Sequence, residues 1–316
     1  MSETSDYDGA WKNALEAYFC GFLALFWPRL HAQIDWTHAP VFLDKELQRL
    51  MRSTKRGRLH VDKLVQLRQT GGSKILVLIH AEIQASHEAD FQLRMFRYHV
   101  RLHEKHPDHA ITSLAVLTYR QKGPTHEVYA YDHMGCSLQF SFPVINLESW
   151  RTRMDELLAL APQNPFAVVV LAQLQANSTH PDQSRLLRKT ELMRYLYLWK
   201  FSRDEILKLF RIIDAMLSLP EVLEEQFAET LAQIEQEHEM TYVSSVERVL
   251  LKRERQQERQ QGEQQGVVKT LSALLAHKFG PIPDWARVRI AEADEIALQR
   301  WALQILDAQR IEDVFT

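Results

Sequence analysis

An apolar segment at residues 74–84, with the sequence Lys-Ile-Leu-Val-Leu-Ile-His-Ala-Glu-Ile-Gln, constrains the fold of this chain most strongly. Two glycines precede it, and before them a second β-like segment carries Asp62. An apolar run of this length is typical of a strand inside a sheet, where residues i and i+2 project from the same face. Glu82 and Gln84 are therefore expected to project together from the end of a central strand.

The carboxylates of Asp62 and Glu82 suit a metal centre. An ionised carboxylate at the end of a buried strand is costly unless it is paired, metal-bound or beyond the buried stretch. With the main-chain carbonyl of Ile83, the two carboxylates would supply the hard oxygen ligands that Mg²⁺ prefers, and Mn²⁺ is an alternative. Such a cation could polarise a phosphate and activate a water for hydrolysis, with Gln84 positioning that water.

The turn between the two strands sets a geometric condition for this centre. A loop formed by the two glycines alone would place Asp62 opposite Ala81, facing away from Glu82. A three-residue loop at residues 71–73 would instead place Asp62 directly across from Glu82. We therefore predict the three-residue loop, or a bulge with the same effect.

The hydrophobic pattern along the chain predicts an α/β fold with element order α-β-β-α-β-β, followed by helices. The expected elements are a helix at 11–30, strands at 58–69 and 74–84, a helix at 88–104, strands at 111–119, 127–131 and 141–147, and mainly helical sequence from 147 to 249. Three regions follow: a main domain with a helical extension at 1–250, a polar Gln/Arg/Glu-rich linker or helix at 251–265, and a small helical domain at 266–316.

Composition favours a soluble cytoplasmic protein. The chain has 316 residues, 46% of them hydrophobic, enough for a substantial core. Cys20 and Cys136 are far apart in sequence, which argues against a disulfide framework. The apolar run at 17–27 is too short to span a bilayer and the acidic start lacks a basic n-region, so we expect no membrane association.

Local basic patches are the expected means of binding nucleic acid, because the net charge is −3. One patch at 45–63 leads into the predicted metal centre, and a second follows one flank of the helix at 88–104. The residues expected to contact DNA phosphates are Arg56, Arg58, Lys63, Arg94, Arg97 and Arg101. The alternative for both patches is an ordinary solvated surface.

Other chemical sites have less support. His99 and His103 have the i, i+4 spacing of zinc ligands, but no third ligand is evident, so a solvated or capping cluster with His106 and His109 is favoured. Glu46 is either an additional carboxylate of the metal centre or a solvated charge. The sequence contains no Gly-x-Ser-x-Gly, Walker or Gly-x-Gly-x-x-Gly motif.

The order of Asp62, a Gly-Gly hairpin and Glu-Ile-Gln at 82–84 resembles the PD-(D/E)XK nuclease superfamily. Asp-Phe-Gln-Leu-Arg-Met-Phe-Arg-Tyr at 90–98 and Asn-Pro-Phe-Ala at 164–167 resemble its Rpn branch, the recombination-promoting nucleases, also described as transposases. Residues 274–315 are similar to a small domain of unknown function appended to such proteins. The resemblance implies a restriction-endonuclease-like core, a mixed central sheet flanked by helices, and a metal-dependent DNA endonuclease acting in recombination.

Gln84 departs from the superfamily pattern, which has Lys at this position. A neutral amide can hydrogen-bond to water but cannot offset developing negative charge. Lys63 and Arg94 are candidates to supply the missing cation, and of the two we favour Arg94. The alternatives to an active nuclease are an inactive nuclease fold that binds DNA, and a scaffold that oligomerises through its C-terminal helices. A homodimer would suit double-strand cutting, although no segment specifies its interface.

Overall fold

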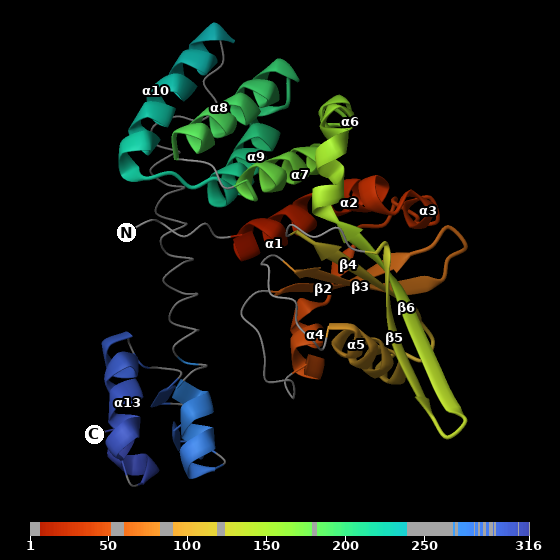
Figure 1. Ribbon diagram of the computed structural model, residues 1–316, viewed down its shortest axis with the longest axis vertical. Coiled ribbons are helices and arrows are strands. Elements are labelled where there is room, and N and C mark those ends of the chain that lie inside the picture. The colour runs from red at the N-terminus through yellow and green to blue at the C-terminus, as the bar shows by residue number, and fades with distance from the viewer. Residues whose placement is uncertain are drawn as a thin grey trace. The chain divides into compact units, whose positions relative to one another are not determined.

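We describe a computed structural model of the chain (Figure 1). The structure describes residues 7–51, 60–82, 91–118, 124–178 and 182–238, and parts of 268–315. At residues 48–51, 60–62 and 80–82 the description is limited to the main chain. The chain divides into two compact units, Met1–Tyr242 and Val243–Thr316, which we treat separately.

The first unit is built on a mixed, open, six-stranded sheet flanked by helices (Figure 1). Its strands are β1 (Val41–Phe42), β2 (His60–Arg68), β3 (Lys74–Glu82), β4 (Ala110–Leu117), β5 (His126–His133) and β6 (Cys136–Asn146). Their order across the sheet is β1-β2-β3-β4-β6-β5. The first three strands are antiparallel, β4 lies parallel to both β3 and β6, and β5 returns antiparallel along β6. The predicted α/β class is confirmed.

Helices α4 (Asp44–Met51) and α5 (Phe91–Lys105) cover one face of this sheet (Figure 1). α5 folds here because Phe91, Met95, Tyr98 and Leu102 recur at helical spacing and form one buried stripe. The stripe packs against even-numbered residues of the antiparallel strands, including Leu64, Leu76 and Leu78. Strand alternation therefore assigns even positions of β2 and β3 to the α5 face.

The opposite face is covered by α1 (Tyr7–Ala17) and α2 (Phe19–Phe26), which are followed by α3 (Pro28–His31) (Figure 1). We predicted a single helix at 11–30, and this is wrong. The backbone leaves the helical region at Tyr18, with φ −129° and ψ 33°, and at Trp27, with φ −134° and ψ 64°. Pro28 then begins α3 at a position where its missing N–H costs nothing.

A helical layer follows the sheet in sequence, as predicted. It comprises the 3-10 helix η1 (Leu147–Arg153) and the helices α6 (Met154–Leu160), α7 (Pro165–Ala176), α8 (Asp182–Leu198), α9 (Arg203–Met216) and α10 (Glu221–Glu237). α7 is apolar on all sides and its residues from Phe166 to Leu174 are buried. Gln173 of α7 accepts a hydrogen bond from the Trp11 indole at 2.7 Å and donates to Asn177 at 2.7 Å, which ties α1 to the end of α7.

The second unit has a hydrophobic core of its own, which includes Leu271, Leu275, Leu298 and Trp301. Its described elements include α13 (Glu295–Asp307) and the 3-10 helix η2 (Ile311–Phe315). The predicted linker at 251–265 lies outside the described residues. None of the described helices is long and apolar enough to cross a membrane.

Candidate functional site

The β2–β3 hairpin determines how Asp62 and Glu82 are related. Its turn has three residues, as predicted, but it is formed by residues 70–72, one position earlier than we expected. Gln69 closes the turn by donating its N–H to the Ser73 carbonyl at 2.8 Å, and Gly72 takes the left-handed conformation at φ 87°. The predicted register is therefore wrong.

As a result Asp62 pairs with His80, and Glu82 pairs with His60. The shift relative to the prediction is an even number of residues, so both acidic positions still belong to the α5 face of the sheet. They are diagonal neighbours on adjacent strands, a relation in which Cα atoms are about 7 Å apart. Carboxylates and main-chain carbonyls are the donor types that Mg²⁺ prefers, and this spacing of the two main-chain positions is compatible with carboxylates that share one cation.

The carboxyl ends of the three parallel strands meet beside these positions. Glu82 pairs with Leu117 of β4, and Leu117 pairs with Asn146 of β6, so the three residues form one row across the sheet. Asn146 is buried, and its side-chain oxygen accepts from the Glu148 N–H at 3.2 Å. No partner for Asn146 Nδ2 is found in the described part of the chain.

Sequence reasoning did not single out Asn146. The sequence signal that could have identified it is an Asn at the end of a strand, two residues before Glu148. This pattern is typical of a side chain that caps a helix. The row places this buried amide on the same edge of the sheet as Glu82.

Four of the predicted site residues lie outside the described residues. They are Ile83, Gln84, Arg56 and Arg58. The side chains of Asp62 and Glu82 are likewise not described. Among the side chains that are described, no group of three or more His, Cys, Asp or Glu could hold a metal ion.

Lys63 does not lie where a phosphate contact requires it. It occupies an odd position of β2, on the face covered by α1, and is 2% exposed. Its ammonium donates to the carboxylates of Glu16 and Asp44. A lysine that is buried and paired with two carboxylates is not available to a phosphate or to a water beside Glu82.

The basic residues of α5 follow the flank of the helix that points away from β5. Gln92 donates to Glu127 of β5 at 2.7 Å and Phe96 stacks on Tyr129 at 5.0 Å, which places one flank of α5 against β5. Helical spacing puts a second set of side chains on the opposite flank, toward β3 and β2. This set consists of Arg94, Arg97, Arg101 and Lys105.

Within this set the environments differ. Arg97 is exposed, whereas Arg94 and Arg101 are half-buried. The Arg94 guanidinium lies 5.8 Å from the centre of the Phe91 ring. Arg94, the residue we favoured to replace the missing lysine, thus lies on the β3 side of the first turns of α5.

Glu46 belongs to a different group of charges. Its carboxylate contacts Lys105 at 2.6 Å and His106 at 2.9 Å, at the C-terminal end of α5. The hydrogen bond from Lys105, and to a lesser extent that from His106, lowers the pKa of Glu46 below its ordinary value of 4.5. These contacts tie α4 to α5, which is a structural role.

The histidines of α5 are likewise engaged in structural contacts. His99 is half-buried, with its Nδ1 3.1 Å from the Ser113 hydroxyl and its ring 4.8 Å from that of Phe140. Burial, and to a smaller degree the neighbouring His103, lower the pKa of His99 below 6.5. These contacts account for His99 as part of the packing between α5 and the sheet.

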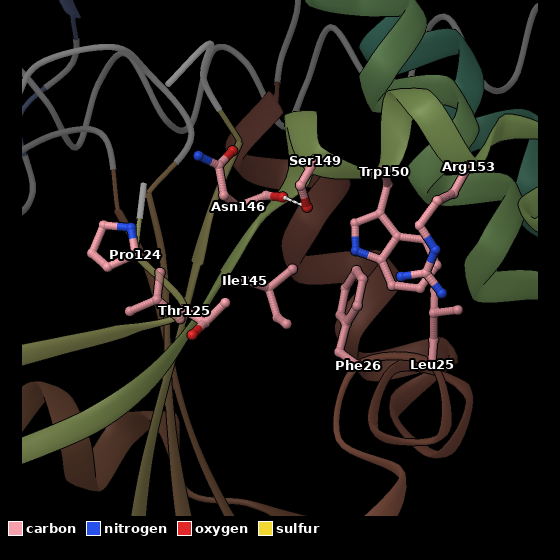
Figure 2. A pocket seen from close by; sticks show the side chains of 10 residues that line it. Leu25, Phe26, Pro124, Thr125, Ile145, Asn146, Ser149, Trp150 and Arg153 are labelled. Atoms are coloured by element: carbon pink, nitrogen blue, oxygen red, sulfur yellow. Dashed lines mark hydrogen bonds between the residues drawn. The ribbon is translucent and has the colours of Figure 1, made fainter. Parts of the chain in front are cut away.

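A pocket of about 310 Å³ opens on the other face of the sheet (Figure 2). It is lined by residues of α2, the segment just before β5, the end of β6 and η1, including Phe26, Thr125, Ile145, Ser149, Trp150 and Arg153. Figure 2 shows the Arg153 guanidinium over the Trp150 ring, at 3.9 Å from its centre, and Ser149 donating to the Asn146 carbonyl at 2.7 Å. Arg153 also makes two hydrogen bonds to Glu156, so its charge is already neutralised within the protein.

Comparison with protein-family models, curated proteins and solved structures found no match to this chain. The geometry defines an α/β protein with a mixed open sheet. The acidic positions Asp62 and Glu82 belong to the sheet face that α5 covers, and the basic flank of α5 lies on the β3 side of that helix.

Proposed function

We propose that this protein is a metal-dependent DNA endonuclease, with Asp62, Glu82 and the Ile83 carbonyl as ligands of one Mg²⁺. The observation that carries the proposal is the β2–β3 register, which keeps two acidic positions on one face of adjacent strands. Carboxylates from adjacent strands are suitable ligands for Mg²⁺ or Mn²⁺. A bound cation would supply Lewis-acid polarisation of a phosphate and an activated water.

The protein's own residues would hold and orient the DNA. The basic flank of α5 lies on the β3 side of the helix, so its guanidinium groups can contact the phosphates next to the scissile one. Among these, exposed Arg97 is the contact that solvent reaches most readily. Gln84 would orient the attacking water through its amide, and Arg94 would offset negative charge that develops on the phosphate.

A second candidate is an inactive nuclease fold that binds DNA without cutting it. It is favoured by the position of Lys63, whose ammonium is buried on the opposite face of the sheet and paired with Glu16 and Asp44. That leaves Arg94 as the remaining candidate we identified for the catalytic cation. A guanidinium stays protonated and cannot act as a general base, but it can stabilise negative charge.

Plasmid cleavage in Mg²⁺ and in Mn²⁺ tests the first proposal. Wild-type protein should cut, while Asp62→Ala and Glu82→Ala should each lose at least about 100-fold in rate, as expected when a metal ligand is removed. Asp108→Ala is the matched control, because Asp108 is an exposed carboxylate in the turn after α5. Equal cutting by all four proteins would show that Asp62 and Glu82 do not form the site.

DNA binding measured on the same proteins separates the two candidates. Metal-dependent cutting supports the endonuclease. Tight binding by wild type with no cutting in either metal supports the inactive fold. A wild-type protein that neither cuts nor binds DNA would contradict both candidates.

A further inference from the structure

β5 ends the sheet, and within the described residues no strand covers its outer edge. Together with β6 it forms a long hairpin that extends past α5 (Figure 1). The hairpin turns at Met134 and Gly135, whose φ values of 48° and 82° match the two-residue turns preferred by twisted hairpins. An edge strand of this length is a template for pairing with another strand unless charge, proline or a covering segment blocks it.

The hairpin also carries exposed apolar side chains. Phe96 of α5 covers Tyr129 and Phe140, but the next cross-strand pair, Tyr131 and Leu138, is 47% and 39% exposed. On the other face Val128 is 42% exposed. Such a surface is typical of a protein interface.

The hydrogen bonds to β6 show which groups of β5 remain at the outer edge. The Thr125 carbonyl accepts from the Val144 N–H at 2.8 Å, so hydrogen-bonded pairs with β6 fall at odd positions of β5. Pro143, which has no N–H, pairs with His126, as a non-hydrogen-bonded pair allows. The N–H and carbonyl groups of His126, Val128, Ala130 and Asp132 therefore point outward.

This alternation limits how a second copy could pair with β5. In an antiparallel pair, the residues whose N–H and carbonyl groups point toward the new partner lie directly opposite the equivalent residues of that partner. Even positions of one copy would therefore lie opposite even positions of the other. Glu127 can then never lie opposite Asp132 of the second copy, so the register that would bring these two carboxylates together is excluded. An arrangement centred on Tyr129 places His126 opposite Asp132 of the second copy, and Val128 opposite its Ala130. Because of the two-fold symmetry, each of these pairs occurs twice in the dimer.

We propose that the outer edge of β5 is a homodimer interface, in which two copies pair antiparallel about a two-fold axis at Tyr129. In this register the His126 imidazole of each copy can donate a hydrogen bond to the Asp132 carboxylate of the other, and this complementarity selects a second copy of this chain as the partner. The matched apolar positions at 128 and 130 then form the centre of the joined strands. This interface does not depend on the proposed nuclease activity.

The molar mass of the full chain, measured by light scattering across a concentration series, tests the interface. Wild type should be a dimer, and Ala130→Pro should be monomeric, because proline removes an outward N–H without disturbing the bonds to β6. Gln139→Ala is the matched control, since Gln139 is exposed on the same face but belongs to β6, and it should remain a dimer. Circular dichroism checks that each variant is folded.

Substitutions that change the charges at positions 126 and 132 provide an independent test that does not introduce a proline. His126→Asp places two carboxylates opposite each other twice per dimer and should weaken dimerisation about tenfold or more. Adding Asp132→Lys to that variant places opposite charges at these two positions and should restore the dimer. A monomeric wild type, even one that captures a strand of another protein, overturns the proposal. So does a His126→Asp variant that dimerises as well as wild type.

Discussion

Lys63 illustrates how one residue can have a role that its neighbours in sequence do not reveal. It follows Asp62 directly, yet strand alternation places it on the opposite face of the sheet. There its ammonium joins Glu16 of α1 and Asp44 of α4 to β2. Its partners are 47 and 19 residues away in sequence, so no local pattern could predict them.

Removal of this ammonium should destabilise the fold. We expect Lys63→Ala to lower the free energy of unfolding by about 2 kcal/mol, less than for a fully buried pair because Glu16 and Asp44 remain partly exposed. Lys12→Ala, which breaks an exposed pair with Asp8, should cost less than about 0.5 kcal/mol. Urea denaturation measures both. Equal effects of the two substitutions would contradict the structural role of Lys63.

The lowered pKa of His99 should make the stability of the first unit depend on pH. Because burial lowers its pKa in the folded protein, the unfolded chain binds more protons below pH 6.5. Stability is therefore complete above pH 6.5 and falls as the pH drops from there toward the folded-state pKa. In His99→Gln this fall should be smaller, whereas His277→Gln, at an exposed position, should behave as wild type. The measurement is the urea midpoint of unfolding from pH 8 to pH 5. If the midpoint changes with pH equally in all three proteins, His99 is not the group responsible.

At the scale of elements, strong periodicity was predictable and weak local signals were not. The stripe of Phe91, Met95, Tyr98 and Leu102 predicted α5, and the apolar run at 75–79 predicted β3. β1 was missed because two residues cannot show a period. β6 begins at Cys136, five residues before the predicted start, because we did not recognise the Met134–Gly135 turn. The β2–β3 register depended on a turn closed by one hydrogen bond, which composition does not specify.

The basic flank of α5 makes a prediction about DNA binding. Arg97→Ala should weaken binding several-fold on any sequence and reduce the dependence of log Kd on log salt concentration by about 1, as expected for one lost phosphate contact. Lys74→Ala is the control, because Lys74 is exposed at the opposite end of β3 from Glu82. Fluorescence anisotropy at several salt concentrations measures this. An unchanged salt slope for Arg97→Ala would exclude that contact.

At the scale of the whole molecule, the division into two units reflects that each unit has hydrophobic packing of its own. The core of the sheet contains Leu64, Leu78 and Met95, and the core of the C-terminal unit contains Leu271 and Trp301. From its polar segment at 251–265 we predicted three regions, and that segment lies outside the described residues. The sequence could not indicate that Asn146 shares a row with Glu82, because that row depends on parallel pairing between strands distant in sequence.

Because each unit has hydrophobic packing of its own, we expect the first unit to fold without the second. A chain that ends at Tyr242 should therefore retain the urea midpoint of the sheet and the plasmid-cutting rate of the full protein. Far-ultraviolet circular dichroism and the cleavage assay measure these properties. A truncated chain that fails to fold would contradict independence of the units.

The central claim is that Asp62 and Glu82 hold one divalent cation together, and anomalous diffraction from a crystal soaked in Mn²⁺ tests it most directly. We expect a single anomalous peak within about 2.2 Å of a carboxylate oxygen of each residue, with the Ile83 carbonyl as a further ligand. In a Glu82→Ala crystal the peak should disappear. A peak elsewhere in the protein, or none between these two carboxylates at saturating Mn²⁺, would contradict the account.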